Sequence, residues 1–200
     1  MAWLGGIESV VLATRNPHKV REFNRLLGGA GIVVEPLPDD VELPPEDGAT
    51  FEDNALPKAR AAAIATGRVS IADDSGIEAQ ALDGRPGVRS ARYAGEDATD
   101  EENLLKLIHE APAGSGLRYV CALAYVDPEG GVERVFFGFC AGRMAEAARG
   151  SGGFGYDPVF LPDGDFGGRT MAELSDEEKD AISHRGVAAS EWVRWLTEAG

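Results

Sequence analysis

The first half of the chain alternates short apolar runs with amphipathic stretches. The run at 9–14, SVVLAT, is apolar at successive positions, which is typical of a central strand covered on both faces. In the stretch that follows, Asn16 is a suitable helix N-cap and Pro17 suits the first helical position. Apolar residues then recur at helical spacing as far as the glycine pair at 28–29. The sequence therefore predicts a strand, a tight turn and a helix in this order.

A second helix is predicted after a loop rich in proline and acidic residues at 36–48. The length of this loop indicates a functional segment. Thr50 and Asp53 have the spacing of a capping box, and an alanine-rich body follows and ends at Gly67. Pro57 lies inside this pattern, so either the helix is kinked or its first turn begins later than Thr50.

The middle of the chain is predicted to hold a loop, a helix and a hairpin. Residues 83–98 contain many turn-forming residues and indicate the loop. The stretch TDEENLLKLIHEAP has the pattern of a capped amphipathic helix, with Leu104, Leu107 and Ile108 facing inward. Two long β runs joined by PEGG at 128–131 then predict an antiparallel hairpin.

The C-terminal region has the pattern of one helical stretch from Ser175 to Ala199, in which Ser175 and Glu178 fit a capping box. Because helices alternate with strands early in the chain and a hairpin follows, we expect an α/β fold with a mixed central β-sheet flanked by helices. No linker divides the sequence, so we expect a single domain over residues 1–200.

Composition narrows the classes of function. Apolar residues make up 44% and charged residues 26% of the 200, which is typical of a globular protein. The net charge of −15 disfavours binding to nucleic acid, although a local group of cations can still bind a small anion. No apolar run approaches the ~18 residues of a membrane span. Cys121 and Cys140 lie in apolar runs and are expected to be reduced core residues of a cytoplasmic protein with no membrane association.

The stretch SIADDSGIEA at 70–79 places two aspartates side by side where an apolar run ends. Side chains alternate across a strand, so Asp73 and Asp74 cannot both face one pocket while the strand stays regular. We expect one to act as metal ligand or base and the other to support it. A carboxylate at the carboxyl end of a strand lies where open α/β sheets bind ligands, and Mg²⁺ prefers such oxygen ligands. The alternative is a solvated turn.

The turn from Thr14 to Lys19 is a candidate phosphate site. Free backbone N–H groups at the start of a helix bind phosphate, and Arg15 and Lys19 add positive charge there. The alternative is an ordinary capped turn, because the sequence carries neither a Walker signature nor a dinucleotide-binding glycine signature.

Two later segments carry further candidate binding residues. GGFGYDP at 152–158 places Phe154 and Tyr156 among glycines, which suits stacking on a planar ring; exposed loop aromatics also often cover a core. EEKDAISHRG presents cations near the C-terminal helix, where Lys179 suits a phosphate and Arg185 suits a base carbonyl. Cations scattered over the surface of an amphipathic helix are the alternative.

Five motifs in this order resemble the noncanonical purine nucleoside triphosphate pyrophosphatases, the inosine triphosphatase (HAM1-like) family. They are LATRNPHKVREF, EDGATFEDNALPKAR, ADDSGIEAQALDGRPGVRSARYAG, GGFGYDPVF and TMAELSDEEKDAISHRG, and they span almost the whole chain. The resemblance implies an inosine-triphosphatase-like fold with a cleft between two lobes. It also implies a homodimeric cytoplasmic enzyme that uses Mg²⁺ to hydrolyse ITP, dITP and XTP to the monophosphate and pyrophosphate.

The resemblance implies roles for individual residues. Glu46 and Asp74 would bind the metal, and Asp74 would also be the base, with Asp73 supporting it. Substrate-binding residues would be Thr14, Arg15, Asn16, Pro17, His18, Lys19, Ser75, Phe154, Gly155, Tyr156, Asp157, Lys179, His184 and Arg185. Further candidates are Asp53, Asn54, Lys58, Asp73 and Arg92. Many relatives have Glu-Asn where this chain has Asp-Asn at 53–54, so the carboxylate has less reach here.

Two other functions stay open at this point. One is a Maf-like nucleotide pyrophosphatase of related fold, which would act on modified or pyrimidine triphosphates. The other is a nucleotide-binding regulator, which would bind ITP tightly without releasing pyrophosphate. A panel of purine and pyrimidine triphosphates separates the three hypotheses.

Overall fold

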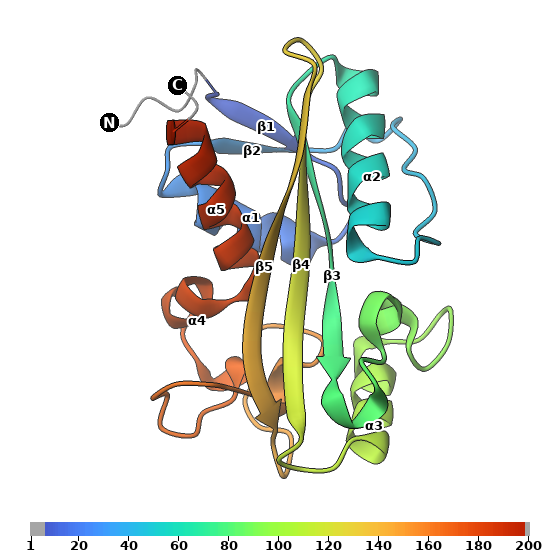
Figure 1. Cartoon of the computed structure of the whole chain (residues 1–200), viewed down its shortest axis with the longest axis vertical. Helices are drawn as coiled ribbons and strands as arrows, with labels where there is room; N and C mark the ends of the chain where they lie inside the picture. Colours follow the sequence, from blue (N-terminus) through green and yellow to red (C-terminus); the bar gives the residue numbers. More distant parts are fainter. Residues whose placement is uncertain (1–6, 199–200) are drawn as a thin grey trace. The chain divides into compact units, whose positions relative to one another are not determined.

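The apolar runs form six strands that join in one sheet, in the order β2-β1-β3-β4-β5-β6. Figure 1 labels β1 to β5. This computed structural model describes residues 7–198. The strands are β1 (Ser9–Leu12), β2 (Val33–Pro36), β3 (Ser70–Ala79), β4 (Gly116–Asp127), β5 (Val132–Met144) and β6 (Phe160–Pro162). β1 is parallel to β2 and β3, whereas β5 and β6 are antiparallel. The sheet is therefore mixed, which confirms the predicted α/β fold class.

The α-helices begin where the sequence provides caps. They are α1 (Pro17–Gly28), α2 (Phe51–Thr66), α3 (Asp100–Glu110), α4 (Asp176–Ile182) and α5 (His184–Glu198). Asn16 caps α1 through its side chain, and capping boxes start α2, α3 and α4. Four short 3₁₀ helices cover Gln80–Leu82, Gly87–Arg92, Asp157–Val159 and Met171–Glu173.

The predicted hairpin is confirmed. β4 and β5 are neighbours in the sheet, and only residues 128–131 separate them in the chain. A connection this short joins antiparallel strands, because a parallel pair needs a crossover of a dozen or more residues.

The chain divides into two compact units, each built from separate segments. Unit 1 contains residues 1–74, 121–138 and 185–200, and unit 2 contains residues 75–120 and 139–184. β3, β4 and β5 each contribute residues to both units, because the divisions fall within these strands. The single domain expected from the sequence stays a prediction.

The core of unit 1 packs β1 against α1 and α5. Its buried cluster includes Leu12 from β1, Phe23 and Leu27 from α1, and Trp192 from α5. Val11 points to the other face of β1, where α2 contacts this strand and buries a row of alanines. Small side chains let α2 approach the sheet closely, so the two faces of β1 are both covered, as the sequence predicted.

The core of unit 2 combines aliphatic residues of β3 and α3 with aromatic residues. Ile77 and Leu107 are fully buried, and they belong to the same cluster as Tyr119, Tyr156 and Phe160. Tyr156 is thus a core residue of this unit, which excludes for it the alternative of an exposed loop aromatic; the predicted stacking on a planar ring stays a prediction.

The C-terminal helical stretch differs from its prediction. The backbone at Ser183 is extended, with φ of −65° and ψ of 149°, and it separates α4 from α5. The capping box of Ser175 and Glu178 is confirmed at the start of α4. The predicted end at Ala199 lies outside the described residues.

Three other predictions are settled by the local structure. α2 begins at Phe51 and continues through Pro57, so the later start is excluded. Ile108 is 38% exposed, so its predicted inward orientation is wrong.

Asn103 is buried on α3, and its side chain forms hydrogen bonds with the backbone of the 83–98 segment at residues 91 and 94. That segment includes a 3₁₀ helix and is not an irregular loop throughout.

Both cysteines are free and buried, as predicted. Within residues 7–198, none of the helices has the length and apolar character needed to cross a bilayer.

Candidate active site

Two adjacent aspartates lie in the middle of β3. The prediction that the strand ends at them is wrong, because buried apolar residues, Ile77 and Ala79, continue the strand beyond them. The alternative of a solvated turn is also wrong, since Asp73 is 0% and Asp74 6% exposed. β1 ends at Leu12, which is in register with Ile71, so β3 extends past β1 toward the turn that follows Leu12.

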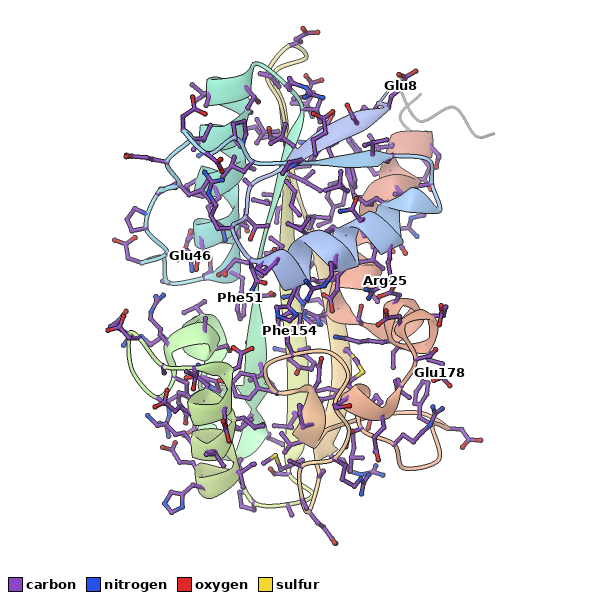
Figure 2. The ribbon with its side chains drawn as sticks, turned by 180° about the vertical axis from the view of Figure 1, so that it is seen from behind. Glu8, Arg25, Glu46, Phe51, Phe154 and Glu178 are labelled. Atoms are coloured by element: carbon purple, nitrogen blue, oxygen red, sulfur yellow. The ribbon has the colours of Figure 1, made fainter. Side chains whose placement is uncertain are left out.

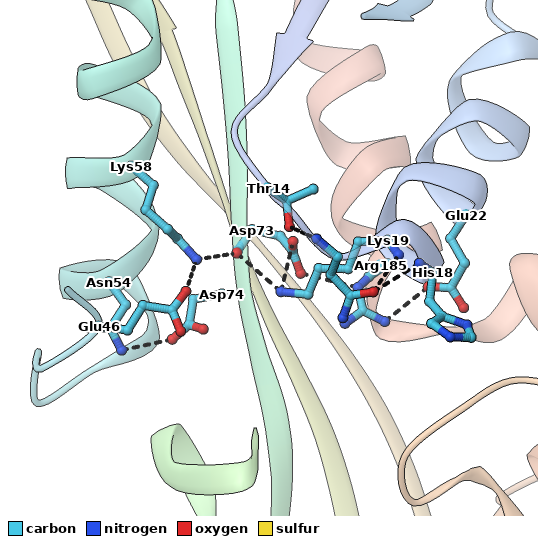
Figure 3. Close-up of polar contacts among 11 residues, drawn as sticks. Thr14, His18, Lys19, Glu22, Glu46, Asn54, Lys58, Asp73, Asp74 and Arg185 are labelled. Atoms are coloured by element: carbon cyan, nitrogen blue, oxygen red, sulfur yellow. Dashed lines mark hydrogen bonds and ion pairs between the residues drawn. The ribbon is translucent and has the colours of Figure 1, made fainter. Parts of the chain in front are cut away.

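The two aspartates point to different sides of β3, as side-chain alternation predicted. Figure 3 shows Asp73 directed toward Lys19 and Arg185, and Asp74 directed toward Asn54. One strand therefore presents two carboxylates to two different environments, both within unit 1.

On the first side, Asp73 belongs to a charge-balanced group. Lys19 Nζ lies 3.1 Å from Asp73 Oδ1, and Arg185 Nε donates to Asp73 Oδ2 at 3.1 Å. Arg185 Nη1 donates to Glu22 Oε2 at 2.9 Å, so two carboxylates meet two cations. Burial disfavours the charge of Asp73, but Lys19, Arg185 and Lys58 outweigh burial and hold the pKa of Asp73 well below its ordinary value.

On the second side, Asp74 and Glu46 share one cation. Asn54 Nδ2 donates to Asp74 Oδ2 at 2.9 Å, and no hydrogen-bond donor among residues 7–198 reaches Asp74 Oδ1. Lys58 Nζ pairs with Glu46 and donates to the backbone oxygen of Asp73 at 2.8 Å. Burial raises the pKa of Asp74 above its ordinary value, although Lys58 and Asn54 oppose this rise. This side therefore carries a surplus of negative charge.

The start of α2 explains how Asn54 and Lys58 come to this position. Thr50 and Asp53 form the capping box, with Asp53 Oδ2 accepting from Thr50 N at 3.1 Å. Asn54 and Lys58 are four residues apart and so lie on one face of the helix. Glu46 lies on the loop that leads into α2, as Figure 2 shows beside Phe51. The carboxylate of Asp53 thus caps the helix.

Gly48 allows the loop to approach this helix closely. Its N–H donates to Asn54 Oδ1 at 2.8 Å. A Cβ at this position would lie 2.6 Å from Asp53 Cβ and 2.7 Å from Asn54 Oδ1, both closer than real contacts. The loop therefore fixes the orientation of the amide that holds Asp74.

The Thr14–Lys19 turn is organised by its own side chains. Asn16 Oδ1 accepts from the N–H of His18 at 2.8 Å and of Lys19 at 3.4 Å, and Thr14 Oγ1 accepts from Asn16 N at 3.2 Å. The guanidinium of Arg15 donates to backbone oxygens of residues 37, 38, 39 and 41. Lys19 thus brings its charge to Asp73, while Arg15 directs its charge to the 37–41 loop. The role of this turn in phosphate binding stays a prediction.

In unit 2, the glycine-rich motif is organised by Asp157. Phe154 N donates to Asp157 Oδ2 at 3.0 Å, and Lys179 Nζ donates to the same oxygen at 2.7 Å. Gly153 has a φ of +68°, and a Cβ there would lie 2.0 Å from Asp157 Oδ2. Gly155 N donates to Asp100 Oδ2 at 3.2 Å. The glycines therefore let the backbone fold around a buried carboxylate.

The three candidate donors Lys179, His184 and Arg185 are buried. Lys179 is 5%, His184 4% and Arg185 5% exposed, so the alternative of scattered surface cations is wrong. Lys179 and His184 belong to unit 2, whereas Arg185 belongs to unit 1.

The candidate residues thus form two groups. Unit 1 holds the Thr14–Lys19 turn, Glu46, Asp53, Asn54, Lys58, Asp73, Asp74 and Arg185, and unit 2 holds Ser75, Arg92, Phe154, Gly155, Tyr156, Asp157, Lys179 and His184. Arg92 Nε lies 3.9 Å from Glu96 Oε1.

Sequence reasoning missed Glu22, which pairs with Arg185. The helical spacing of three residues between Lys19 and Glu22 was a usable signal for it.

Glu46 and Asp74 fit a divalent cation. Their carboxylates are hard oxygen ligands, and with Lys58 they leave an excess of negative charge. Among residues 7–198 no three or more His, Cys, Asp or Glu side chains gather as a ligand set. A cation here would therefore keep water or substrate oxygens as ligands, as Mg²⁺ usually does.

The fold matches that of solved HAM1 proteins. A HAM1 protein from Coxiella burnetii has a TM-score of 0.83 and 38% identity, and the match covers 96% of this chain and 100% of that one. A structure from Mycobacterium abscessus, titled nucleoside-triphosphatase / dITP/XTP pyrophosphatase, has a TM-score of 0.69 and 44% identity over 92% of this chain and 97% of that one.

Sequence comparison agrees with the structural match. A dITP/XTP pyrophosphatase of Frankia alni is 49% identical over 94% of this chain and 97% of its own length. One of Symbiobacterium thermophilum is 50% identical over 94% of each chain. The model of the Ham1 family matches residues 10–195, and this chain belongs to that family.

Proposed function

We propose that this protein hydrolyses noncanonical purine nucleoside triphosphates, namely ITP, dITP and XTP, to the nucleoside monophosphate and pyrophosphate. Family membership and the relatives named dITP/XTP pyrophosphatase support the substrate class. The observation that carries the chemistry is the buried Asp74, which keeps one carboxylate oxygen available beside Glu46 and Lys58.

The reaction follows from the environment of Asp74. Water attacks the α-phosphorus, a new O–P bond forms, the bond to the bridging α–β oxygen breaks, and pyrophosphate leaves. Asp74 Oδ1 accepts the proton of the attacking water, while Asn54 holds Oδ2 in place. Because burial raises the pKa of Asp74, its carboxylate is a stronger base than an exposed one.

We propose Mg²⁺ as the metal, held by Glu46 and Asp74. When bound, Mg²⁺ would neutralise charge on the phosphate oxygens. The surplus negative charge of these two carboxylates supports the assignment. Lys58 and Lys19 would bring positive charge to the triphosphate.

For the base and sugar, we propose the unit 2 residues Phe154, Tyr156, Lys179 and His184; Lys179, predicted from the sequence to suit a phosphate, is assigned here because its charge is engaged by Asp157 beside Phe154. The burial and fixed geometry of Lys179 and His184 support this assignment. Arg185 is a further candidate for the base, because its donors suit a base carbonyl, and two of these donors are engaged by Asp73 and Glu22. We propose that the enzyme works as a cytoplasmic homodimer, on the same resemblance, which analytical ultracentrifugation and cell fractionation would test.

A substrate panel tests the function. ITP, dITP, XTP, GTP, dTTP and UTP are each incubated with the protein and Mg²⁺, and pyrophosphate is measured separately from orthophosphate. We expect pyrophosphate from ITP, dITP and XTP well above that from the other three. A preference for pyrimidine triphosphates would indicate the Maf-like function instead. Tight binding of ITP without pyrophosphate release would indicate the regulator.

A further inference from the structure

Tyr119 lies on β4 in unit 2 and belongs to none of the sequence motifs. It is 6% exposed. Its ring stacks on His184, with a centroid distance of 4.7 Å and an interplanar angle of 11°, and on Phe160, with a distance of 4.5 Å and an angle of 29°. A near-parallel contact of this kind restricts the plane of the imidazole. Tyr119 therefore holds His184 by its ring.

The hydroxyl of the same side chain holds Asp157. Tyr119 Oη donates to Asp157 Oδ1 at 3.0 Å. The other oxygen, Oδ2, accepts from Lys179 Nζ at 2.7 Å and from Phe154 N at 3.0 Å. Both oxygens of this buried carboxylate thus accept hydrogen bonds within the unit. The orientation of the Asp157 carboxylate therefore fixes the Lys179 ammonium and the backbone N–H of Phe154.

We propose that Tyr119 is a positioning residue for nucleoside recognition. Its ring sets the plane of His184, and its hydroxyl, acting through Asp157, sets the positions of Lys179 and Phe154. Asp157 accordingly organises the binding residues and is not primarily a substrate contact. This inference rests on the proposed function, because His184, Lys179 and Phe154 are assigned there to the nucleoside.

Two substitutions separate the ring from the hydroxyl. Tyr119→Phe keeps the stack and removes the donor to Asp157, whereas Tyr119→Leu removes both. Tyr125 provides a matched control, because it lies on the same strand and is also buried, with 3% of its surface exposed. Its ring packs against Trp192 and Trp195 of unit 1, with centroid distances of 5.8 and 5.5 Å, and neither tryptophan is a candidate site residue.

The first measurement is the kinetics of dITP hydrolysis. For Tyr119→Phe we expect a KM about 10-fold higher and a kcat within about two-fold of wild type, because a hydrogen bond to a charged group is lost away from the reacting atoms. For Tyr119→Leu we expect a KM about 100-fold higher. Tyr125→Phe should stay within about two-fold in both constants.

The second measurement separates positioning from loss of structure. Inosine monophosphate carries the base and sugar, whereas inorganic tripolyphosphate carries only the phosphate chain. In Tyr119→Phe we expect inhibition by inosine monophosphate to weaken by about 10-fold, in line with the loss of a hydrogen bond to a charged group, and inhibition by tripolyphosphate to stay unchanged. Equal weakening of both would indicate a structural role and overturn the inference.

The outcomes also separate this inference from the proposed function. If wild-type protein releases pyrophosphate from dITP and Tyr119→Phe leaves KM unchanged, the inference alone is overturned. If wild-type protein releases no pyrophosphate from ITP, dITP or XTP, the proposed function fails and the inference fails with it. The Phe variant retains the ring and its packing, so it keeps the test valid if the Leu variant does not fold.

Discussion

The two units satisfy their buried carboxylates in different ways. In unit 2, Asp157 receives the donors of Tyr119, Lys179 and Phe154 on its two oxygens. In unit 1, the one side-chain donor to the Asp74 carboxylate within residues 7–198 is Asn54, and a second carboxylate, Glu46, acts on Asp74. A carboxylate with three of its about four acceptor sites occupied has little capacity left for chemistry, whereas one that accepts a single hydrogen bond can hold a cation or accept a proton. The difference separates a residue that organises from a residue that reacts.

Asp73 and Asp74, which are neighbours on β3, also differ in how their charges are balanced. Burial disfavours ionisation of both aspartates, yet the pKa of Asp73 is lowered and that of Asp74 is raised. The reason is the number of cations: Lys19 and Arg185 contact the Asp73 carboxylate directly, whereas Lys58 is the chief cation acting on Asp74. Strand alternation thus gives one dipeptide two opposite electrostatic environments.

The largest expected effect comes from Asp74→Asn. We expect kcat to fall by at least about 10³-fold, because both a metal ligand and the base are lost. Stability should not fall. The folded protein raises the pKa of Asp74, so ionisation of this side chain lowers the free energy of unfolding at a pH above its unfolded pKa. The neutral amide of Asn does not ionise, so the variant should be at least as stable as wild type at pH 7. Pyrophosphate release and thermal unfolding in EDTA at pH 7 check both parts. Retained turnover would remove Asp74 from the chemistry.

Asp73→Asn should have the reverse effect on stability. Removing its charge leaves the half-buried Lys19 and the buried Arg185 without their shared partner, with Glu22 still paired to Arg185, and breaking a buried ion pair costs about 3–5 kcal/mol. Urea unfolding monitored by tryptophan fluorescence gives this number directly. A loss below about 1 kcal/mol, typical of an exposed pair, would show that the group is solvated in solution.

Gly48→Ala tests whether the hydrogen bond from Asn54 to Asp74 depends on the close packing of the loop that precedes α2. Because the added Cβ would overlap Asp53 and Asn54, we expect a loss of about 1–3 kcal/mol in unfolding free energy. Activity should fall as well, since Asn54 would shift away from Asp74. Gly28→Ala at the end of α1 is the control, because nothing lies within 4 Å of its Cβ. Equal behaviour of the two variants would contradict the tight packing of the loop.

Much of this arrangement could be predicted from local sequence signals. The caps at Asn16 and Thr50 set the starts of α1 and α2, and two-residue alternation separated Asp73 from Asp74. The break at Ser183 was missed because the apolar pattern continues across it, while only the backbone conformation changes.

The contacts of Glu22 and Tyr119 were missed for a different reason. Arg185 and Glu22 are 163 residues apart in the chain, and Tyr119 and Asp157 are 38 apart. Neither pair follows a helical or strand period, so no pattern within one segment could indicate either contact; the spacing of Glu22 from Lys19 places both on one face of α1 but does not indicate Arg185 as a partner. Such contacts depend on the assembled sheet.

One feature of α5 constrains how its sequence can change. His184 and Arg185 are consecutive at its start, yet the first stacks on Tyr119 in unit 2 and the second pairs with Asp73 in unit 1. Inserting one residue between them would rotate the rest of the helix by about 100° and withdraw one of the two contacts. Natural insertions and deletions should therefore be absent at this junction, even where surface turns such as 128–131 vary in length.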